Sequence, residues 1–210
     1  MLKKTALIFC CFAMINTATA ENVQKNKYLK FSVGIPIHNY VSSHDIRDFK
    51  FIPSGSMVFG KKLSNSNINI ELEGTYHYLS GKCYSLKTDV SIINGFINAV
   101  WFKDIKNSNI SPYMGLGVGV SHTKTTDIIA NGQIVFAGGD LIKPIAQWFI
   151  GADYKYNSKL SFIGDIRYTY LGKIRHKHVH DISSLAALNG VVNDGKIQNI
   201  SIICGIKYKF

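Results

Sequence analysis

The chain lacks the features that would mark a membrane helix or a common catalytic centre. Beyond its first residues it has no run of about 20 apolar residues, the length that a membrane-spanning helix needs. It also contains no Walker string, no HExxH motif, no CxxC pair, no internal repeat and no low-complexity tract. These absences exclude a P-loop nucleotide site and a HExxH zinc site. The fold has to be predicted from the spacing of apolar and polar residues instead.

Cysteine is scarce as well. Of the four cysteines, only Cys83 and Cys204 lie beyond residue 20. The topology derived below puts them near opposite ends of the fold, whereas the Cα atoms of a disulfide approach within about 7 Å. We therefore expect two free thiols.

The first residues are typical of a secretory signal peptide. A basic start at Lys3 and Lys4 is followed by an apolar stretch over residues 7–15 and by Ala18-Thr-Ala20, a small-residue cleavage site. A lipoprotein reading through Cys10 or Cys11 is disfavoured, because Phe9 and Cys10 precede them where small residues are needed. We expect residues 1–20 to be removed and residues 21–210 to form one domain.

Acidic residues are also few. The formal charge of +11 becomes +9 (11 − 2) without Lys3 and Lys4. Such a balance suits nucleic acid, a membrane surface or an acidic coat outside the cell. Export argues against nucleic acid, which leaves membrane lipids, lipopolysaccharide and acidic polysaccharide as expected partners.

What the chain does have is alternation. In the last segment, residues 197–210, apolar residues at every second position (Ile200 to Phe210) oppose a polar set (Asn199 to Lys209), and only Ile203 breaks the pattern. A period of two indicates an extended strand with one apolar face. Seven further segments read as strands: residues 28–37, 54–63, 68–79, 86–102, 110–125, 143–156 and 160–172.

The connections between these segments alternate between short turns and longer gaps. This rhythm is typical of an up-and-down barrel with turns on the periplasmic side and loops outside the cell. Several apolar faces end in tyrosine, as in the aromatic girdles of membrane barrels. The sequence therefore predicts an all-β, eight-stranded antiparallel up-and-down transmembrane β-barrel. The alternative, a soluble sandwich or lipocalin-like barrel, would turn its apolar face inward.

One strand fits this pattern poorly. In residues 86–102, Val90 and Ile92 set one phase, while Ile93, Ile97 and Trp101 set the other. We expect a β-bulge there, unless the register has been misread from the sequence.

The string Pro112-Tyr113-x-Gly115-x-Gly117-x-Gly119 resembles the fifth strand of small outer-membrane surface antigens, the OmpA-like and opacity-type barrels. These include the major surface proteins of intracellular alphaproteobacteria. Residues 98–101 and 166–170 resemble the fourth and seventh strands of that family. The resemblance implies a surface-exposed bacterial outer-membrane protein, often antigenic and in some members an adhesin for host receptors. It implies no cofactor and no catalytic residues, and it implies that the final aromatic, Phe210, helps the insertion machinery to recognise the chain.

Three sets of residues are candidates for chemistry. The first is the inward face, which should collect charges of both signs that either pair into a plugged core or line a small pore: Glu71, Glu73, Asp153, Lys155, Asp165, Arg167, Lys207 and Lys209. The second is a histidine cluster in the last long gap, His176, His178 and His180 with Asp181, which could hold Zn, Cu or Ni or simply form a basic loop.

The third set would suit a lipid-modifying enzyme. Ser121, His122 and Asp127 fall near the top of the fifth strand and His77 near the top of the third, but they follow no recognisable catalytic spacing. The sequence thus favours a structural, antigenic or adhesive surface protein, with a small pore or a lipid-modifying enzyme as the alternative.

Overall fold

The computed structural model describes residues 27–41, 46–83, 86–126, 128–130, 133–137, 139–174, 177–178 and 195–210. The expected signal peptide, residues 1–20, lies outside them. Every regular element among the described residues is a strand: β1 (Lys27–Val41), β2 (Ile46–Phe51), β3 (Ser54–Lys62), β4 (Ile68–Cys83), β5 (Leu86–Phe102), β6 (Ile110–Thr125), β7 (Ile128–Ala130), β8 (Gln133–Ala137), β9 (Asp140–Lys155), β10 (Leu160–Ile174), β11 (Lys177–His178) and β12 (Gly195–Lys209). No helix long and apolar enough to cross a membrane occurs in this part of the chain.

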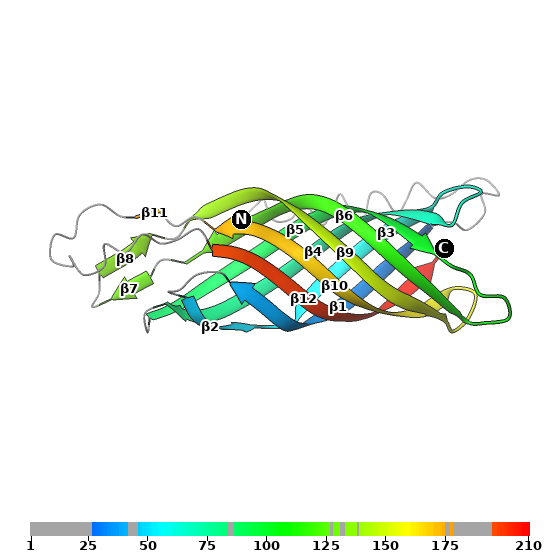
Figure 1. Ribbon diagram of the computed structural model, residues 1–210, viewed down its shortest axis with the longest axis horizontal. Helices are drawn as coiled ribbons and strands as arrows, with labels where there is room; N and C mark the ends of the chain where they lie inside the picture. The colour runs from blue at the N-terminus through cyan, green and yellow to red at the C-terminus, as the bar shows by residue number, and fades with distance from the viewer. Residues whose placement is uncertain are drawn as a thin grey trace.

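Eight of the strands close into an antiparallel barrel in the order β1-β3-β4-β5-β6-β9-β10-β12 (Figure 1). The closure is the pairing of β12 with β1, which sets Lys209 opposite Tyr28 and Ile202 opposite Ile35. A closed cylinder pairs the backbone groups along every edge, as a hydrocarbon environment requires. The predicted eight-stranded barrel is confirmed.

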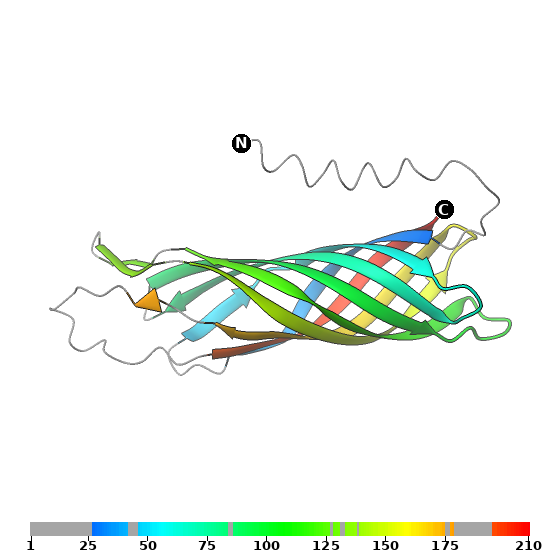
Figure 2. The same cartoon turned by 90° about the horizontal axis from the view of Figure 1, so that it is seen from above.

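The two ends of the barrel differ. At the turn end, defined by residues 63–67, 103–109 and 156–159, short connections join the strands (Figure 2). Asn65 and Asn107 adopt φ values of 56° and 58° there, a left-handed conformation that asparagine tolerates better than most residues. At the opposite loop end lie β2, which extends the sheet beside β4, and a separate sheet of β7, β8 and β11.

Several gaps expected from the sequence are in fact strand. The predicted gap around Gly81 is wrong, because β4 and β5 stay paired as far as Cys83 and Leu86. The gap between β6 and β9 contains the β7–β8 hairpin. Gly81 and Cys83 interrupt the apolar alternation, but the backbone pairing does not depend on it.

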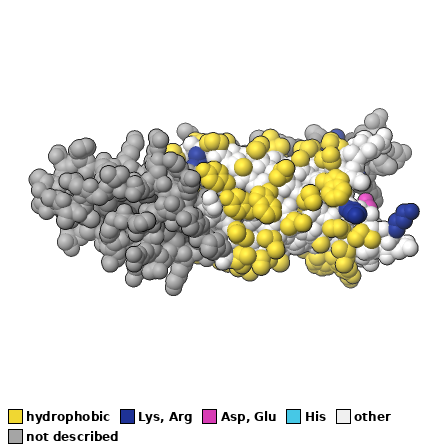
Figure 3. Space-filling model, in the orientation of Figure 1, with side chains coloured by type: hydrophobic (Ala, Val, Ile, Leu, Met, Phe, Trp, Pro, Cys, Tyr) yellow, Lys and Arg dark blue, Asp and Glu magenta, His cyan; other side chains and the backbone are white. Residues whose placement is uncertain are grey.

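The outer surface carries an apolar belt around the barrel (Figure 3). Along β6, Leu116 and Val118 are 70% and 68% exposed, while their chain neighbours point inward. The predicted lipid-facing positions of β12 follow the same rule, with Ile202, Ile206 and Tyr208 exposed. The belt is the arrangement expected of a membrane barrel and the reverse of a soluble one. Its exposed members include Val33, Ile35, Leu72, Ile97, Leu116, Val118, Ile142, Ile150, Ile166 and Ile206.

The strand β5 is regular, so the expected bulge is wrong. Its registers with β4 and β6 run without a shift. Ile93 and Ile97 face outward into the belt, whereas Val90, Ile92 and Phe96 are buried inside the barrel. The two phases seen in the sequence are therefore two apolar faces of one strand, because the interior beside β5 is itself partly apolar.

Candidate functional site in the barrel interior

The centre of the barrel is crossed by an ion pair between Arg167 of β10 and Glu73 of β4, two strands on opposite sides of the cylinder. The second carboxylate oxygen of Glu73 accepts hydrogen bonds from the side-chain amides of Asn98 and Gln147, each at 2.8 Å. The Arg167 guanidinium also lies 4.7 Å from the centre of the Phe149 ring. The ion pair and the two amide hydrogen bonds compensate for the burial of the Glu73 charge. These four side chains therefore tie strands on opposite sides of the lumen together.

A second group lies closer to the turn end. Lys30 of β1 donates to Glu71 Oε1 at 2.5 Å, and the Tyr28 hydroxyl donates to the same oxygen at 2.5 Å. The Asn69 amide in turn donates to the Tyr28 oxygen at 2.9 Å. These side chains are all buried, so the three hydrogen bonds replace contacts that the same groups would make with water in the unfolded chain.

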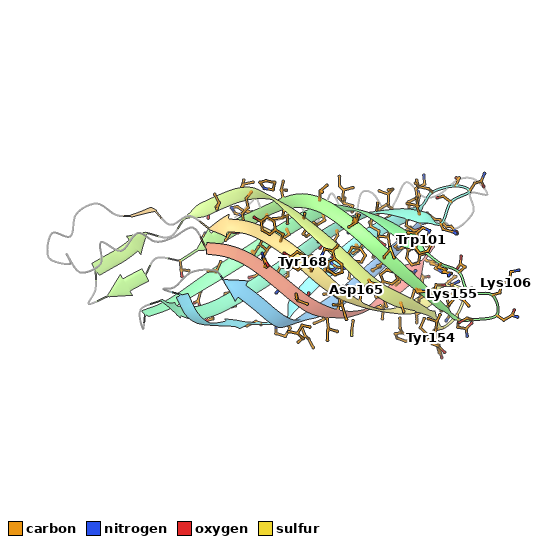
Figure 4. The ribbon with its side chains drawn as sticks, viewed as in Figure 1. Trp101, Lys106, Tyr154, Lys155, Asp165 and Tyr168 are labelled. Atoms are coloured by element: carbon orange, nitrogen blue, oxygen red, sulfur yellow. The ribbon has the colours of Figure 1, made fainter. Side chains whose placement is uncertain are left out.

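Aromatic rings fill the space between the polar groups. Val100, Tyr113 and Phe149 form a buried cluster against which Phe102 packs. The Tyr113 hydroxyl donates to Asp165 at 3.0 Å, which ties the rings to the polar network. Figure 4 shows Asp165 inside the barrel, with Tyr168, Trp101 and Tyr154 on its wall. An interior of this kind combines apolar packing with paired charges, although one oxygen of Asp153 and one of Asp165 have no hydrogen-bond partner among the described residues.

The glycines of the Pro-Tyr-Gly string, Gly115, Gly117 and Gly119, face this interior. A Cβ at Gly115 would collide with the Phe149 ring, and one at Gly117 with the Asn98 side chain. At Gly119 the collision would be with the carbonyl oxygen of Gly95. The string therefore makes room for the side chains that plug a narrow barrel.

Little space is left along the axis. Between the central ion pair and the loop end, the cavity beside His77 and Arg167 measures about 10 Å³, no more than a single water needs. At the turn end a cavity of about 160 Å³ opens toward solvent inside the ends of β1, β3, β4, β5, β6, β9 and β12. The interior is thus plugged at its centre and hollow at one mouth.

Six of the eight predicted inward charges are buried inside the barrel, and Lys155 and Lys209 lie half-buried at its turn end. Lys207 pairs with Asp153 at the floor of the turn-end cavity, and Lys155 pairs with Asp104 at 3.0 Å on its rim. The Lys155 ammonium, hydrogen-bonded to Asp104, holds the pKa of that carboxyl below its usual value. Sequence reasoning missed Lys30 and Lys143, both buried, although the alternation in β1 and β9 places them on the inward face.

The enzyme candidates are separated by the strand geometry. Ser121 is fully buried inside the barrel, whereas His122 points outward and its side chain is 43% exposed. Consecutive residues of a strand face opposite sides, so this pair cannot act as nucleophile and base. His122 lies 3.8 Å from Asp140, His77 contacts Thr75 inside the barrel at 3.1 Å, and Asp127 lies outside the described residues.

Most of the predicted histidine cluster cannot be placed in the structure. His176, His180 and Asp181 lie outside the described residues, and β11 places only the backbone of His178. Among the residues that the structure describes, no group of three His, Cys, Asp or Glu side chains could hold a metal ion. Cys204 is a free, exposed thiol on the apolar belt, and of Cys83 only the backbone position is described.

Comparison with known proteins rests on structure alone, since no protein-family model matches the chain and no curated protein matches its sequence. The outer membrane protein OprG from Pseudomonas aeruginosa is 17% identical over 88% of this chain and 96% of its own, with a TM-score of 0.60. This chain has the fold of the small outer-membrane β-barrels. Neisserial surface protein A is 14% identical over 90% of this chain and 100% of its own, with a TM-score of 0.57.

The structural similarity to outer-membrane barrels and the apolar belt both indicate a membrane protein. A closed barrel with an apolar outer surface and a charged interior is built for a lipid bilayer, because only its outside meets hydrocarbon. The finer resemblance to OmpA-like and opacity-type antigens stays a prediction from the sequence.

Proposed function

We propose that the protein is a surface protein of the bacterial outer membrane whose barrel anchors loops with a structural, antigenic or adhesive role. The observation that carries the proposal is the asymmetry of the barrel. Short turns join the strands at one end, whereas β2, β7, β8 and β11 lie beyond the barrel at the other (Figure 1). A chain that places its additional residues at one mouth uses that mouth for contact.

The packed interior supports the same proposal. The Arg167–Glu73 ion pair and the rings of Tyr113 and Phe149 occupy the lumen, which leaves the loop end as the larger accessible surface. The end of β10 and the residues that follow it are basic in sequence, with Lys173, Arg175 and Lys177 beside interleaved histidines. We propose that residues 173–195 bind acidic polysaccharide, lipopolysaccharide phosphate or a host receptor.

The end of the barrel that faces the periplasm has a separate role in this proposal. β12 closes the cylinder against β1 and leaves Phe210 on the turn-end rim, where its ring lies 6.4 Å from that of Phe59. We propose that the insertion machinery recognises this strand and its final aromatic, as the resemblance to surface antigens implies.

The first experiment tests the orientation. Protease added to intact cells is expected to cut within residues 173–195 and to spare the turn at residues 103–109. Heat-modifiable gel migration of the surviving fragment shows that the barrel is folded. Cleavage at the turn and protection of residues 173–195 would reverse the proposed orientation.

The second experiment tests adhesion. Replacing residues 175–194, which include Arg175, Lys177 and the histidines, by a short Gly-Ser linker should abolish binding of the bacteria to host cells or to immobilised acidic polysaccharide. An insertion of equal length at residues 64–67 is the matched control and should leave binding unchanged. If the loop replacement binds as well as the parent, the adhesive role is wrong and a structural role remains.

A further inference from the structure

The turn-end cavity is an open space inside the barrel, and it is rich in lysine. Four lysines line it, Lys62, Lys155, Lys207 and Lys209, against two carboxylates, Asp104 and Asp153. Its volume of about 160 Å³ exceeds what one water needs by an order of magnitude. The cavity can therefore admit a small polar molecule from the solvent side.

The floor of the cavity is rigidly built. Lys207 pairs with Asp153, and its ammonium lies 5.1 Å from the centre of the Tyr28 ring and 4.9 Å from that of Phe102. Contacts with two rings and a carboxylate fix the position of this charge. Asp153 is 1% exposed, and its second oxygen has no hydrogen-bond partner among the described residues.

The rim carries charge without a counterion. Lys155 pairs with Asp104 at 3.0 Å, which uses the second carboxylate of the cavity. Lys62 and Lys209 line the same space and form no ion pair within the described part of the chain. Two lysines in excess of two aspartates give the cavity a surplus of positive charge, and low-dielectric walls focus the field of such a surplus.

The surface around the mouth adds to this field. The connections of the turn end carry Lys103, Lys106 and Lys159, all exposed, and Asp104 is the one acidic residue in the described ranges 61–67, 103–109, 155–159 and 207–210. Figure 4 shows Lys106 on its turn beyond the mouth and Lys155 at the mouth itself. An anion that approaches this end meets positive charge first at the rim and then inside.

We infer that the turn-end cavity binds a soluble oxyanion, a phosphate or carboxylate group on a small carrier that also offers a hydroxyl donor. Lys62 and Lys209 would hold the oxyanion, because lysine ammonium groups bind such oxygens as point charges. The hydroxyl would satisfy the free oxygen of Asp153, which otherwise stays buried without a partner. Phosphorylated and carboxylated sugars combine both groups, and this site is independent of the loop end and its proposed role.

The test uses the folded full-length barrel in nanodiscs of zwitterionic lipid, with glucose 6-phosphate and glucuronate as probes. Each probe is expected to shift the backbone amide resonances of Lys62, Asp104 and Lys209 saturably, whereas glucose should not. The double variant Lys62→Gln/Lys209→Gln should weaken the Kd about tenfold or more, or about 1.4 kcal/mol.

The matched control removes the same charge from the same end without touching the cavity. Lys106→Gln/Lys159→Gln should change the Kd less than twofold, and heat-modifiable migration should confirm that both double variants fold. Equal weakening by the two variants would reduce the effect to the general field of the turn end and overturn the site.

A lipid headgroup is the other source of a phosphate at this mouth. Nanodiscs that contain phosphatidylglycerol, without any sugar, separate the two sources. Because the cavity opens along the barrel axis and away from the belt, the lipid should not reproduce the shifts. Shifts that appear only with phosphatidylglycerol, or no saturable response to either sugar, would show that the inference is wrong.

Discussion

Arg167 reaches across the whole lumen to Glu73, whose two amide donors come from β5 and β9. Replacing Arg167 with alanine leaves a buried carboxylate with no counterion, and breaking such a pair costs about 3–5 kcal/mol. We expect Arg167→Ala to lower the free energy of unfolding by that amount. Urea titration of the barrel in lipid vesicles, followed by tryptophan fluorescence, measures it.

The double variant Arg167→Ala/Glu73→Gln separates charge from packing. It should recover part of the lost stability, because the neutral amide no longer needs a counterion. Unchanged urea midpoints and heat-modifiable migration in Arg167→Ala would contradict the assignment of these side chains to the interior.

Asp104 makes the second prediction at this scale, through its hydrogen bond from Lys155 at 3.0 Å. The pKa of Asp104 is lowered in the folded protein, so its contribution is present above the unfolded pKa and is lost as pH falls through the folded one. Asp104 is solvent-exposed, so the contribution should not exceed about 1 kcal/mol. Comparing unfolding of the parent and Asp104→Asn from pH 7 downward should show a gap that closes in acid. A gap that widens in acid would contradict the sign.

At the scale of an element, β6 tests how tightly a strand fits its neighbours. A Cβ at Gly119 would strike the carbonyl oxygen of Gly95 in β5, whereas a Cβ at the outward Gly74 in β4 meets nothing within 4 Å. Gly119→Ala should destabilise the barrel by about 1–3 kcal/mol. Gly74→Ala should be neutral or stabilise it by up to about 1 kcal/mol, because it restricts only the unfolded chain. Urea midpoints of the two variants, measured side by side, decide this, and equal effects would contradict the inward packing of the glycine string.

Most of the strands were predictable because they alternate apolar and polar residues over a long run. Alternation in β12 and β10 assigns both faces correctly, and the resulting closure of β12 on β1 follows from the strand count. Alternation does not assign the faces of β5, because Val90 and Ile92 are apolar and yet point inward. A period-two pattern shows which face of a strand is polar. It identifies the inward face only where the barrel interior is itself polar.

The pairing inside the barrel was not predictable in the same way. Strand faces indicate that Glu73 and Arg167 both point inward, but their meeting depends on the stagger of strands on opposite sides of the cylinder. The turn-end cavity depends on the same stagger, which brings Lys62, Lys155 and Lys209 from three strand ends to one mouth. No spacing in the sequence encodes that juxtaposition.

At the scale of the whole molecule, the plugged centre favours an anchor over a small pore. The cavity beside Arg167 measures only about 10 Å³. The buried Phe149 ring lies against the Arg167 guanidinium, and the Tyr113 ring packs on that of Phe149. We expect the barrel to give no steady single-channel current in planar bilayers. Arg167→Ala should also stay silent, because the rings still fill the lumen and the lost ion pair affects stability instead.

A general porin in the same bilayers supplies the positive control, and folded protein recovered from the bilayer by heat-modifiable migration excludes a loss of material. Charge-selective current that changes with Lys207→Gln would mean that ions pass the turn-end cavity and cross the centre. Such a result would require the Arg167–Glu73 pair to open in the membrane, and the barrel would then serve as a conduit and not only as an anchor for its loop end.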